Sequence, residues 1–345
     1  MGMRGFAIVL LLALAQPAFS GTPSPDLERS YWVHASLGSL LQKGYMKADA
    51  KPAEMPRRQE VQNAARLLAG PYAANRLYLV YHHELPIDDA RRVFTWWREA
   101  LPAGVEIVPS LVLRMYDKQE TPVWTPQEAA ALADFFRKNI NRDRIAVYDV
   151  YPDRDQGPAL TELAARFPKG LLRVGVQPEE ALPASVVEGV EDTWSGFCHG
   201  RRNVEDWQQP GFGAETLRRW VELRNRGRMP IAWDLIAVAW DYRPTRRGEF
   251  PGYDDAEKNE PLPPGRNRLA AELIRRTARA EVFAGFSSDL CILDANSRAA
   301  AHDGSAAGFY ESLRQGREYD GYYAAPLKEI AAIYRELRDA AKRPN

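Results

Sequence analysis

The chain has 345 residues, a length that suits either one large α/β domain or two smaller domains. Its 46 basic side chains balance 46 acidic ones, so the formal net charge is zero. This balance argues against nucleic acid or an acidic membrane surface as the main partner, because those partners select an excess of basic side chains.

The N-terminus has the pattern of a secretory signal peptide. Met1–Arg4 is a short basic segment, and Phe6–Ala15 is an unbroken apolar run of about ten residues, too short to span a bilayer comfortably. Ala18-Phe19-Ser20 fits a small-x-small cleavage site. We therefore expect a signal peptide at residues 1–20, export to the periplasm or the extracellular space, and no membrane span after signal removal. An uncleaved membrane anchor is the alternative.

Eight segments of the mature chain have the composition of strands, since they are rich in β-branched and aromatic residues and are bounded by turn residues. They are Ser30–Leu37, Asn75–Tyr81, Val105–Val112, the first half of Arg144–Asp155, Leu171–Val176, Val186–Val190, Met229–Leu235 and Glu281–Phe286.

Helical patterns lie between most of these strands. Thr125-Pro126 is a typical helix start, with Thr as the N-cap and Pro at the first helical position. The expected helices are Arg57–Leu68, Pro86–Ala100, Pro126–Ile140, Pro158–Phe167, Ala214–Arg224, Asn267–Ala280 and Pro326–Lys342, with a reduced helix in Pro178–Ser185. The last helix is amphipathic and is expected to close the ring.

Alternating strands and helices predict a parallel sheet, and eight such units predict a closed (β/α)8 TIM-type barrel that forms a single domain over residues 21–345. No G-x-G-x-x-G sequence follows any expected strand, which argues against a dinucleotide-binding fold, and no cofactor is predicted. The alternative is an open α/β sheet with a decorated edge.

Polar residues gather where the expected strands end, which is the face of a β/α barrel that carries the functional site. They are His34, His82, His83, Glu84, Arg114, Tyr116, Asp149, Tyr151, Asp153, Gln177, Glu191, Asp192, Trp194, Asp234, Ser288 and Asp289. Helix capping explains part of this set, and it fits Asp153 and Asp289 best. It explains Asp149 and Asp234 less well, because apolar strand residues flank both, so we expect these two in the barrel mouth.

Glycoside cleavage requires paired carboxylates, because one acid protonates the leaving oxygen and the other attacks the sugar carbon or activates water. Asp149 is the first catalytic candidate, with Asp192 or Glu191 as its partner and Asp234 as the alternative partner. Aromatic faces stack on sugar rings and polar groups bind hydroxyls. The expected binding residues are His82, His83, Glu84, Tyr151, Trp194 and Trp240, although each Trp is also explained by packing beneath a loop.

In the order of its elements, nearly the whole mature chain resembles the (β/α)8 glycoside hydrolases, and the acids Asp149 and Asp192 follow the fourth and sixth expected strands. No diagnostic motif is shared. Asp149-Val150 stands where one group has Asn-Glu, and Asp149, Asp153 and Asp155 lack the spacing of the chitinase-like acidic run. The resemblance implies an enzyme that acts on a polysaccharide or glycoconjugate.

Two other functional classes remain open. A metal-dependent hydrolase could use ligands among His34, His82, His83, Asp149 and Asp289. However, the adjacent His82 and His83 would point to opposite faces of a regular strand, and we predict no metal site. A non-catalytic carbohydrate-binding or assembly protein would keep the barrel without the chemistry.

The two cysteines, Cys198 and Cys291, both follow expected strands, on one face of the proposed barrel. In an exported protein they could form one disulfide. The alternative is two separate buried thiols, and the sequence does not indicate an oligomeric state.

Overall fold

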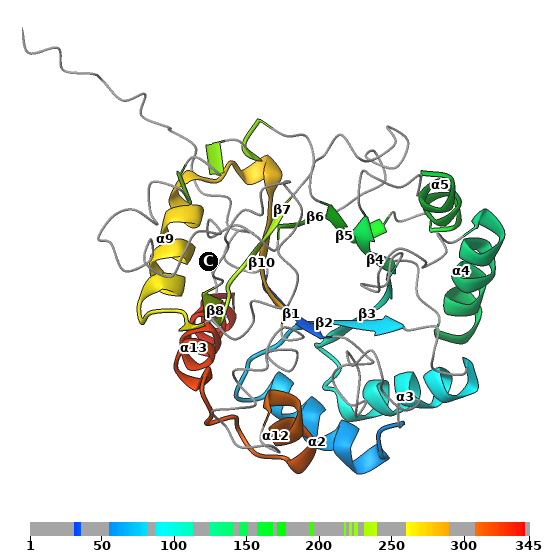
Figure 1. Ribbon diagram of the computed structural model, residues 1–345, viewed down its shortest axis with the longest axis horizontal. Coiled ribbons are helices and arrows are strands. Elements are labelled where there is room, and N and C mark those ends of the chain that lie inside the picture. The colour runs from blue at the N-terminus through cyan, green and yellow to red at the C-terminus, as the bar shows by residue number, and fades with distance from the viewer. Residues whose placement is uncertain are drawn as a thin grey trace, which may run out of the picture.

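The computed structural model describes residues 31–35, 55–81, 87–112, 125–140, 145–150, 157–167, 171–176, 193–195, 217–218, 221–222, 224–226, 231–239, 260–289 and 308–341. Within them, parallel strands form a closed barrel in the order β1-β10-β7-β6-β5-β4-β3-β2 (Figure 1). Each strand therefore pairs with its neighbours in the sequence around the ring. The prediction of an α/β barrel is confirmed, and the open-sheet alternative is wrong.

The barrel strands are β1 (Tyr31–Ala35), β2 (Arg76–Tyr81), β3 (Glu106–Val112), β4 (Ile145–Val150), β5 (Leu171–Val176), β6 (Thr193–Ser195), β7 (Ile231–Asp234) and β10 (Phe283–Asp289). Two short strands, β8 (Val238–Ala239) and β9 (Glu260–Pro261), pair antiparallel outside the barrel.

The helices are α2 (Arg58–Ala69), α3 (Ile87–Ala100), α4 (Pro126–Ile140), α5 (Gly157–Arg166), α9 (Arg266–Thr277), α12 (Phe309–Gln315) and α13 (Ala324–Ala341), with a 3-10 turn, η4, at Ala280–Val282. They lie around the outside of the barrel (Figure 1). Most expected helices are confirmed within a few residues. Residues 217–224 include further helical residues, where Ala214–Arg224 is the expected helix.

Two strand positions differ from the sequence-based prediction. The sixth barrel strand is β6 at Thr193–Ser195, whereas the predicted strand Val186–Val190 lies outside the described residues. The last barrel strand continues through Asp289 instead of ending at Phe286. Ser287 and Ser288 are buried in this extension, so their partners in the fold stabilise polar residues that resemble a loop in the sequence.

Local capping explains where helix α4 begins. The backbone N–H of Glu128 donates to Thr125 Oγ1 at 3.2 Å, and the backbone N–H of Thr125 donates to Glu128 Oε2 at 2.8 Å. This reciprocal pair satisfies backbone donors that have no partner within the first turn. The predicted N-cap at Thr125 is confirmed.

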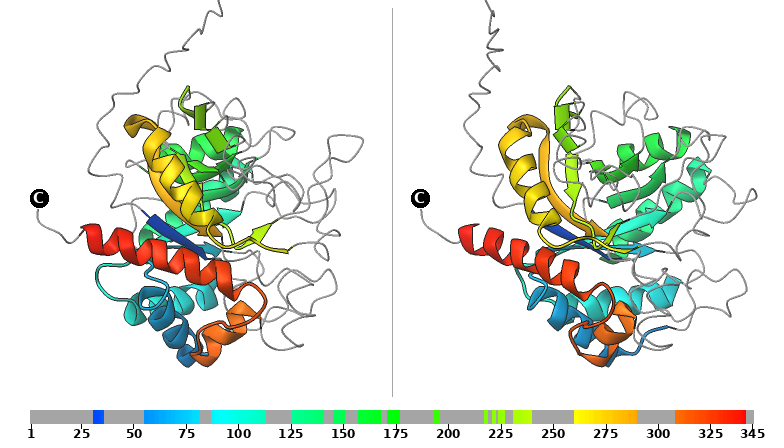
Figure 2. Two further views of the ribbon diagram at one scale, coloured as in Figure 1. Left: turned by 90° about the vertical axis from the view of Figure 1, so that its left-hand side faces the viewer. Right: turned by 60° about the vertical axis from the view of Figure 1, so that its left-hand side comes forward.

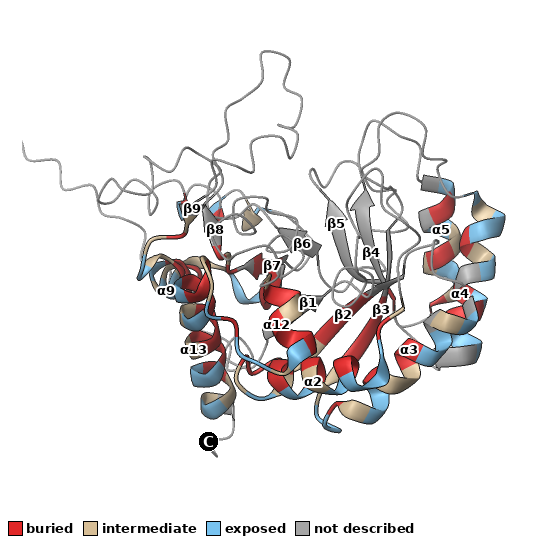
Figure 3. Cartoon of the chain, turned by 60° about the horizontal axis from the view of Figure 1, so that its bottom comes forward, coloured by how far each residue is buried: buried red, intermediate tan, exposed pale blue. Residues whose placement is uncertain are grey.

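The hydrophobic core lies between the barrel and its helices. Leu77 and Leu79 of β2, Leu68 of α2, Trp97 of α3 and Phe136 of α4 belong to one buried cluster. Figure 3 shows buried residues along β2 and β3 and on helix faces that turn toward the barrel. Each fully buried side chain of this kind stabilises the fold by about 1.5–3 kcal/mol relative to an exposed one.

The C-terminal segment fills the space between α9 and α2. Helix α13 lies beside α9, and α12 packs on α2 (Figures 1 and 2). Asn63 Nδ2 donates to the carbonyl of Arg314 at 2.6 Å, and Arg66 Nη2 donates to the carbonyl of Gly316 at 2.8 Å. The predicted helix Pro326–Lys342 is confirmed as α13, whereas α12 was not predicted.

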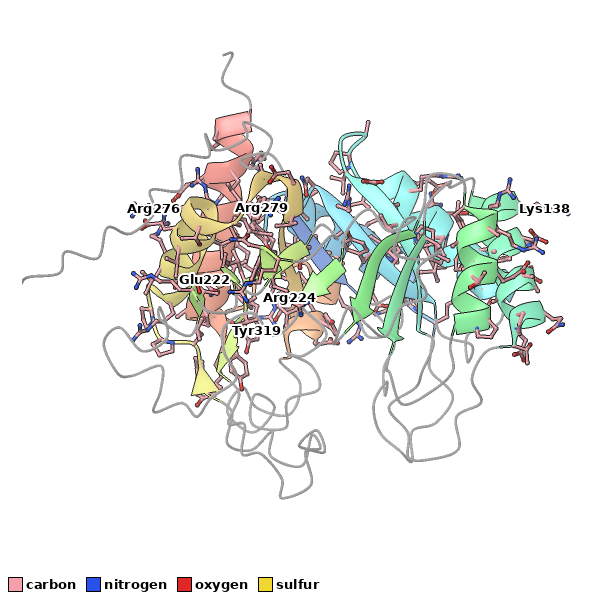
Figure 4. All side chains as sticks on the ribbon, turned by 90° about the horizontal axis from the view of Figure 1, so that it is seen from above. Lys138, Glu222, Arg224, Arg276, Arg279 and Tyr319 are labelled. Atoms are coloured by element: carbon pink, nitrogen blue, oxygen red, sulfur yellow. The ribbon has the colours of Figure 1, made fainter. Side chains whose placement is uncertain are left out.

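The chain before β7 is fixed to the end of α9. Asn225 Nδ2 donates to the carbonyl of Thr277 at 2.9 Å, and the backbone N–H of Arg279 donates to Asn225 Oδ1 at 2.9 Å. Figure 4 labels Arg279, which donates in this contact. Among the helices that the structure describes, none is long and apolar enough to cross a membrane.

Candidate functional site at the barrel mouth

Side-chain contacts identify the two faces of the barrel strands. On β10, the Ser288 hydroxyl lies 2.6 Å from the hydroxyl of Tyr334 on the outer helix α13. Phe286, two residues earlier, belongs to the core between the barrel and its helices, as does Trp233 on β7. Because side chains alternate along a strand, positions 287 and 289 belong to the inner face.

The inner and outer faces of the neighbouring strands follow from strand register, because residues that lie side by side in a parallel sheet share a face. Asp234 is in register with Ser287, and His34 is in register with both Asp289 and Tyr78. Positions 34, 234 and 289 are therefore inner positions at the carboxyl ends of β1, β7 and β10. Tyr78 is buried but does not belong to the outer core cluster, which contains its neighbours Leu77 and Leu79. This agrees with an inner position for Tyr78.

A β-bulge sits at Asp149. Val147 pairs with Val174 and Val150 pairs with Val176, so Tyr148 and Asp149 together lie opposite the single residue Gly175. In a regular strand, Asp149 would take the outer face, because Tyr148 shares the inner face through its pairing with Val112. The bulge breaks this alternation and makes the inner face accessible to position 149.

Asn267 fixes the chain directly after Asp234. Its Nδ2 donates to the carbonyl of Ile236 at 2.8 Å, and its Oδ1 accepts from the backbone N–H of Ile236 at 3.0 Å. The side chain of Asn267 is fully buried, and β8, which begins at Val238, pairs with β9, which lies shortly before α9. The carboxyl end of β7 is thus held by α9 on one side and by a short ribbon on the other.

The opposite end of the barrel contains an ion pair on the inner face. Arg76 Nε donates to Glu106 Oε2 at 2.7 Å across β2 and β3, and Arg76 Nη1 donates to the Tyr78 hydroxyl at 3.3 Å. Arg76 precedes Tyr78 by two residues, so this pair lies toward the amino ends of the strands. The Arg76–Glu106 pair balances charge at the amino ends of the strands, whereas positions 149, 234 and 289 lie at the carboxyl ends.

Of the predicted catalytic, sugar-binding and disulfide residues, the structure places three within strands. Asp149 lies in β4, Asp234 ends β7, and Trp194 is the central residue of β6, in register with Gly175 and Ala232. Trp194 therefore does not follow the sixth strand but forms part of it. The other predicted residues lie outside the described residues: Glu191, Asp192, His82, His83, Glu84, Tyr151, Trp240, Cys198 and Cys291.

The new position of the sixth strand changes the role expected of two acids. Glu191 and Asp192 were expected after the sixth strand, but they precede β6 in the chain; both lie outside the described residues, so their catalytic role stays a prediction. Sequence reasoning also overlooked Tyr148 and Tyr78, which occupy inner positions within strands. Strict alternation could have indicated Tyr78, whereas the inner position of Tyr148 follows from its pairing with Val112 on β3 and has no local signal.

In the part of the chain that the structure describes, no three His, Cys, Asp or Glu side chains form a group that could hold a metal ion. The candidate site is therefore defined by strand register, which brings positions 34, 234 and 289 onto three adjacent strands.

Comparison with known proteins supports the fold. No protein family matches the chain, and no curated protein does. Among solved structures, AmyP in complex with maltose has a TM-score of 0.50 and 9% identity, covering 92% of this chain and 80% of that chain. The GH99 endo-α-mannosidase from Bacteriodes thetaiotaomicron has a TM-score of 0.49 and 8% identity, covering 90% of this chain and 98% of that chain.

N-acetylneuraminate lyase from Mycoplasma synoviae also matches, with a TM-score of 0.39 and 12% identity, covering 80% of this chain and 74% of that chain. At such low identity, the likeness to AmyP shows the α/β-barrel fold alone. The function has to be argued from the residues at the barrel mouth.

Proposed function

We propose that the protein is an exported, single-domain (β/α)8 glycoside hydrolase that acts on a polysaccharide or glycoconjugate. One observation carries the proposal: aspartates occupy the carboxyl ends of β4, β7 and β10 at positions that the bulge or the register associates with the inner face. Carboxylates placed together in a barrel mouth cost free energy unless they are paired or used in chemistry.

Asp149 and Asp234 are the proposed catalytic pair. They lie on β4 and β7, which are separated by β5 and β6 around the ring, so the two carboxylates can face one another across the mouth. One would protonate the leaving oxygen, and the other would attack the sugar carbon or activate water. Asp234 replaces Asp192 as the partner, because Asp192 precedes β6.

Sugar binding is proposed for Trp194 and for the polar or aromatic residues that follow the strands. Trp194 is in register with Ala232 on β7, two residues before Asp234, so its ring can form a platform beside the catalytic pair. His82, His83 and Glu84 follow β2, and Tyr151 follows β4. Trp240 follows β8, at the start of the connection that leaves β7.

The first experiment measures binding and product release with a panel of bacterial and plant polysaccharides. The purified protein is compared with Asp149→Asn and with a matched control, Asp134→Asn, which changes an exposed acid on α4 paired with Arg166 at 2.8 Å. We expect turnover by the intact protein and the control. Asp149→Asn should lose about 10²–10⁴-fold in kcat while keeping its circular dichroism spectrum.

The same experiment separates the alternatives. Sugar binding without turnover, equal in the intact protein and in Asp149→Asn, would contradict the enzyme proposal and favour a carbohydrate-binding or assembly protein. No recognition of any sugar would contradict both. Metal analysis would then test a metal-dependent hydrolase, an alternative that the register of His34 with Asp289 keeps open.

A further inference from the structure

A buried hydrogen bond on the outside of β10 adjoins the candidate site. The hydroxyls of Ser288 and Tyr334 lie 2.6 Å apart, and the two residues are only 2% and 1% exposed. Leaving a buried hydroxyl without its partner is costly, so this bond strongly fixes where the end of β10 lies against α13.

Ser288 sits between two inner positions of the barrel. Ser287 is in register with Trp32 on β1 and with Asp234 on β7, and Asp289 is in register with His34 on β1. A shift of Ser288 along or across the strand would therefore displace Asp289 relative to both neighbouring strands. Consecutive residues of β10 therefore connect the outer hydrogen bond of Ser288 with the inner position of Asp289.

Helix α13 is itself firmly attached to α9. Glu329 accepts from the backbone N–H groups of Gly265 at 3.0 Å and Arg268 at 2.8 Å, which satisfies free donors at the start of α9. Arg268 also forms two hydrogen bonds with Glu336, each 2.8 Å long. Paired bonds of this type fix geometry as well as adding stability.

Through α9, the same helix reaches the other site strand. Asn267, next to Arg268 in α9, holds both backbone groups of Ile236, two residues after Asp234. Helix α13 therefore contacts β10 directly through Tyr334 and supports the end of β7 through Glu329. The two strand ends that carry Asp234 and Asp289 share one support.

We propose that Tyr334 is a positioning residue of the barrel mouth. Through Ser288, it holds the end of β10 so that Asp289 stays beside His34 and at a fixed place relative to Asp234. The effect on turnover rests on the proposed function, whereas the effect on the geometry of the mouth does not.

The test removes the hydroxyl and keeps the ring, with Tyr334→Phe, and removes the partner with Ser288→Ala. The matched control is Tyr72→Phe, because the Tyr72 hydroxyl is also buried and accepts from the backbone N–H of Tyr319 at 3.1 Å, on the α2–α12 contact. Two readouts are taken from the purified protein. One is the NMR signal of the His34 ring, assigned with His34→Gln, and the other is kcat and KM on the best sugar of the panel.

We expect the His34 signal to shift in Tyr334→Phe and in Ser288→Ala but not in Tyr72→Phe. We also expect kcat to fall by about tenfold or more in the first two variants with little change in KM. A shift of β10 would displace Asp234 through its register with Ser287, and small displacements of a reacting group have large effects on rate. The double variant should resemble either single variant, because both remove the same contact.

An unchanged His34 signal in folded Tyr334→Phe and Ser288→Ala would overturn the proposal. So would an equal shift in the Tyr72→Phe control, because the effect would then be a general loss of stability. If the His34 signal shifts as expected but the intact protein cleaves no sugar, the positioning role of Tyr334 is supported and the glycosidase proposal alone fails.

Discussion

The Glu60 carboxylate interacts with two arginines from distant parts of the chain. It accepts hydrogen bonds from the backbone N–H and the guanidinium of Arg57, both at 2.8 Å, and lies within the field of Arg314 on α12. Burial raises the pKa of Glu60. The hydrogen bonds from Arg57 and the charges of Arg57 and Arg314 lower this pKa by more than burial raises it, so it lies below the ordinary 4.5.

This lowered pKa predicts a pH-dependent contribution to stability. A carboxyl group whose pKa is depressed by folding stabilises the protein fully above its unfolded pKa and loses this effect as the pH falls through the folded pKa. The free energy of unfolding should therefore differ between the intact protein and Glu60→Gln at neutral pH. The difference should shrink as the pH falls below about 4.5, as measured by urea denaturation at several pH values.

The control for this prediction is Glu99→Gln, which breaks a surface ion pair with Arg58 at 2.8 Å. Exposed pairs of this kind contribute only about 0–1 kcal/mol. A difference for Glu60→Gln that stays constant from pH 7 to about pH 2 would show that the carboxylate is not stabilised by Arg57 and Arg314.

Thr125 makes a second prediction about a single side chain. Thr125→Ala removes the hydroxyl that accepts from the backbone N–H of Glu128, and the carboxylate of Glu128 also loses the hydroxyl it accepts from. Loss of such an N-cap should lower the free energy of unfolding by about 1 kcal/mol, measured by urea denaturation. Gln127→Ala, in the same helix turn, is the control, and an equal loss there would count against capping as the cause.

Asn267 matters for the arrangement of whole elements, since it joins α9 to the chain after β7. Asn267→Ala would leave both backbone groups of Ile236 without these partners. The expected cost is about 2–4 kcal/mol, because each unpaired buried group costs about 1–3 kcal/mol and some relaxation follows. Thermal and urea unfolding measure it.

Asn267→Asp is the informative companion, because it keeps the acceptor for the Ile236 N–H and loses the donor to the Ile236 carbonyl. If the two bonds matter as described, both variants should be destabilised and both should lower kcat through Asp234. Wild-type stability in Asn267→Ala would rule out this link between α9 and β7.

Most elements could be predicted from the sequence because their signals are local. The pair Thr125-Pro126 marks the start of α4, a run of aliphatic and aromatic residues marks β2, and β-branched residues mark β4. The features that failed depend on partners elsewhere in the chain. Strand β6 has three residues and exists through its pairing with β5 and β7, and Ser288 is in a strand because Tyr334 satisfies its hydroxyl.

The candidate site was predictable to a similar extent. The positions of Asp149 within β4 and of Asp234 at the end of β7 could be predicted, because apolar strand residues flank both, whereas their catalytic role stays a prediction. The position of Asp192 relative to a strand could not, because it depends on where β6 pairs. The bulge opposite Gly175 is also a property of two strands together, and no local pattern in β4 indicates it.

Residues far apart in the chain pack together outside the closed barrel. Phe309 of α12 packs edge to face on Tyr72, with ring centroids 5.5 Å apart, and on Tyr319 at 5.8 Å. These contacts link the segment after β10 to the segment before β2. The C-terminal helices therefore belong to the folded unit and are more than an appended tail.

Phe309→Ala tests the contribution of this packing. Phe309 is 1% exposed, and truncating a buried Phe costs about 3–5 kcal/mol through lost burial and a new cavity. We expect cooperative unfolding at a clearly lower denaturant concentration, seen by circular dichroism and by faster limited proteolysis. An unchanged midpoint would mean that α12 contributes little to the stability of the barrel.

The most direct test of the account is the activity of Asp149→Asn, Asp234→Asn and the double variant on one cleaved polysaccharide. If the two carboxylates act as a pair, each single variant should lose at least about 10²-fold in kcat/KM, and the double variant should be little worse than the poorer single one. Full activity in either folded single variant would contradict the claim that Asp149 and Asp234 are the catalytic pair.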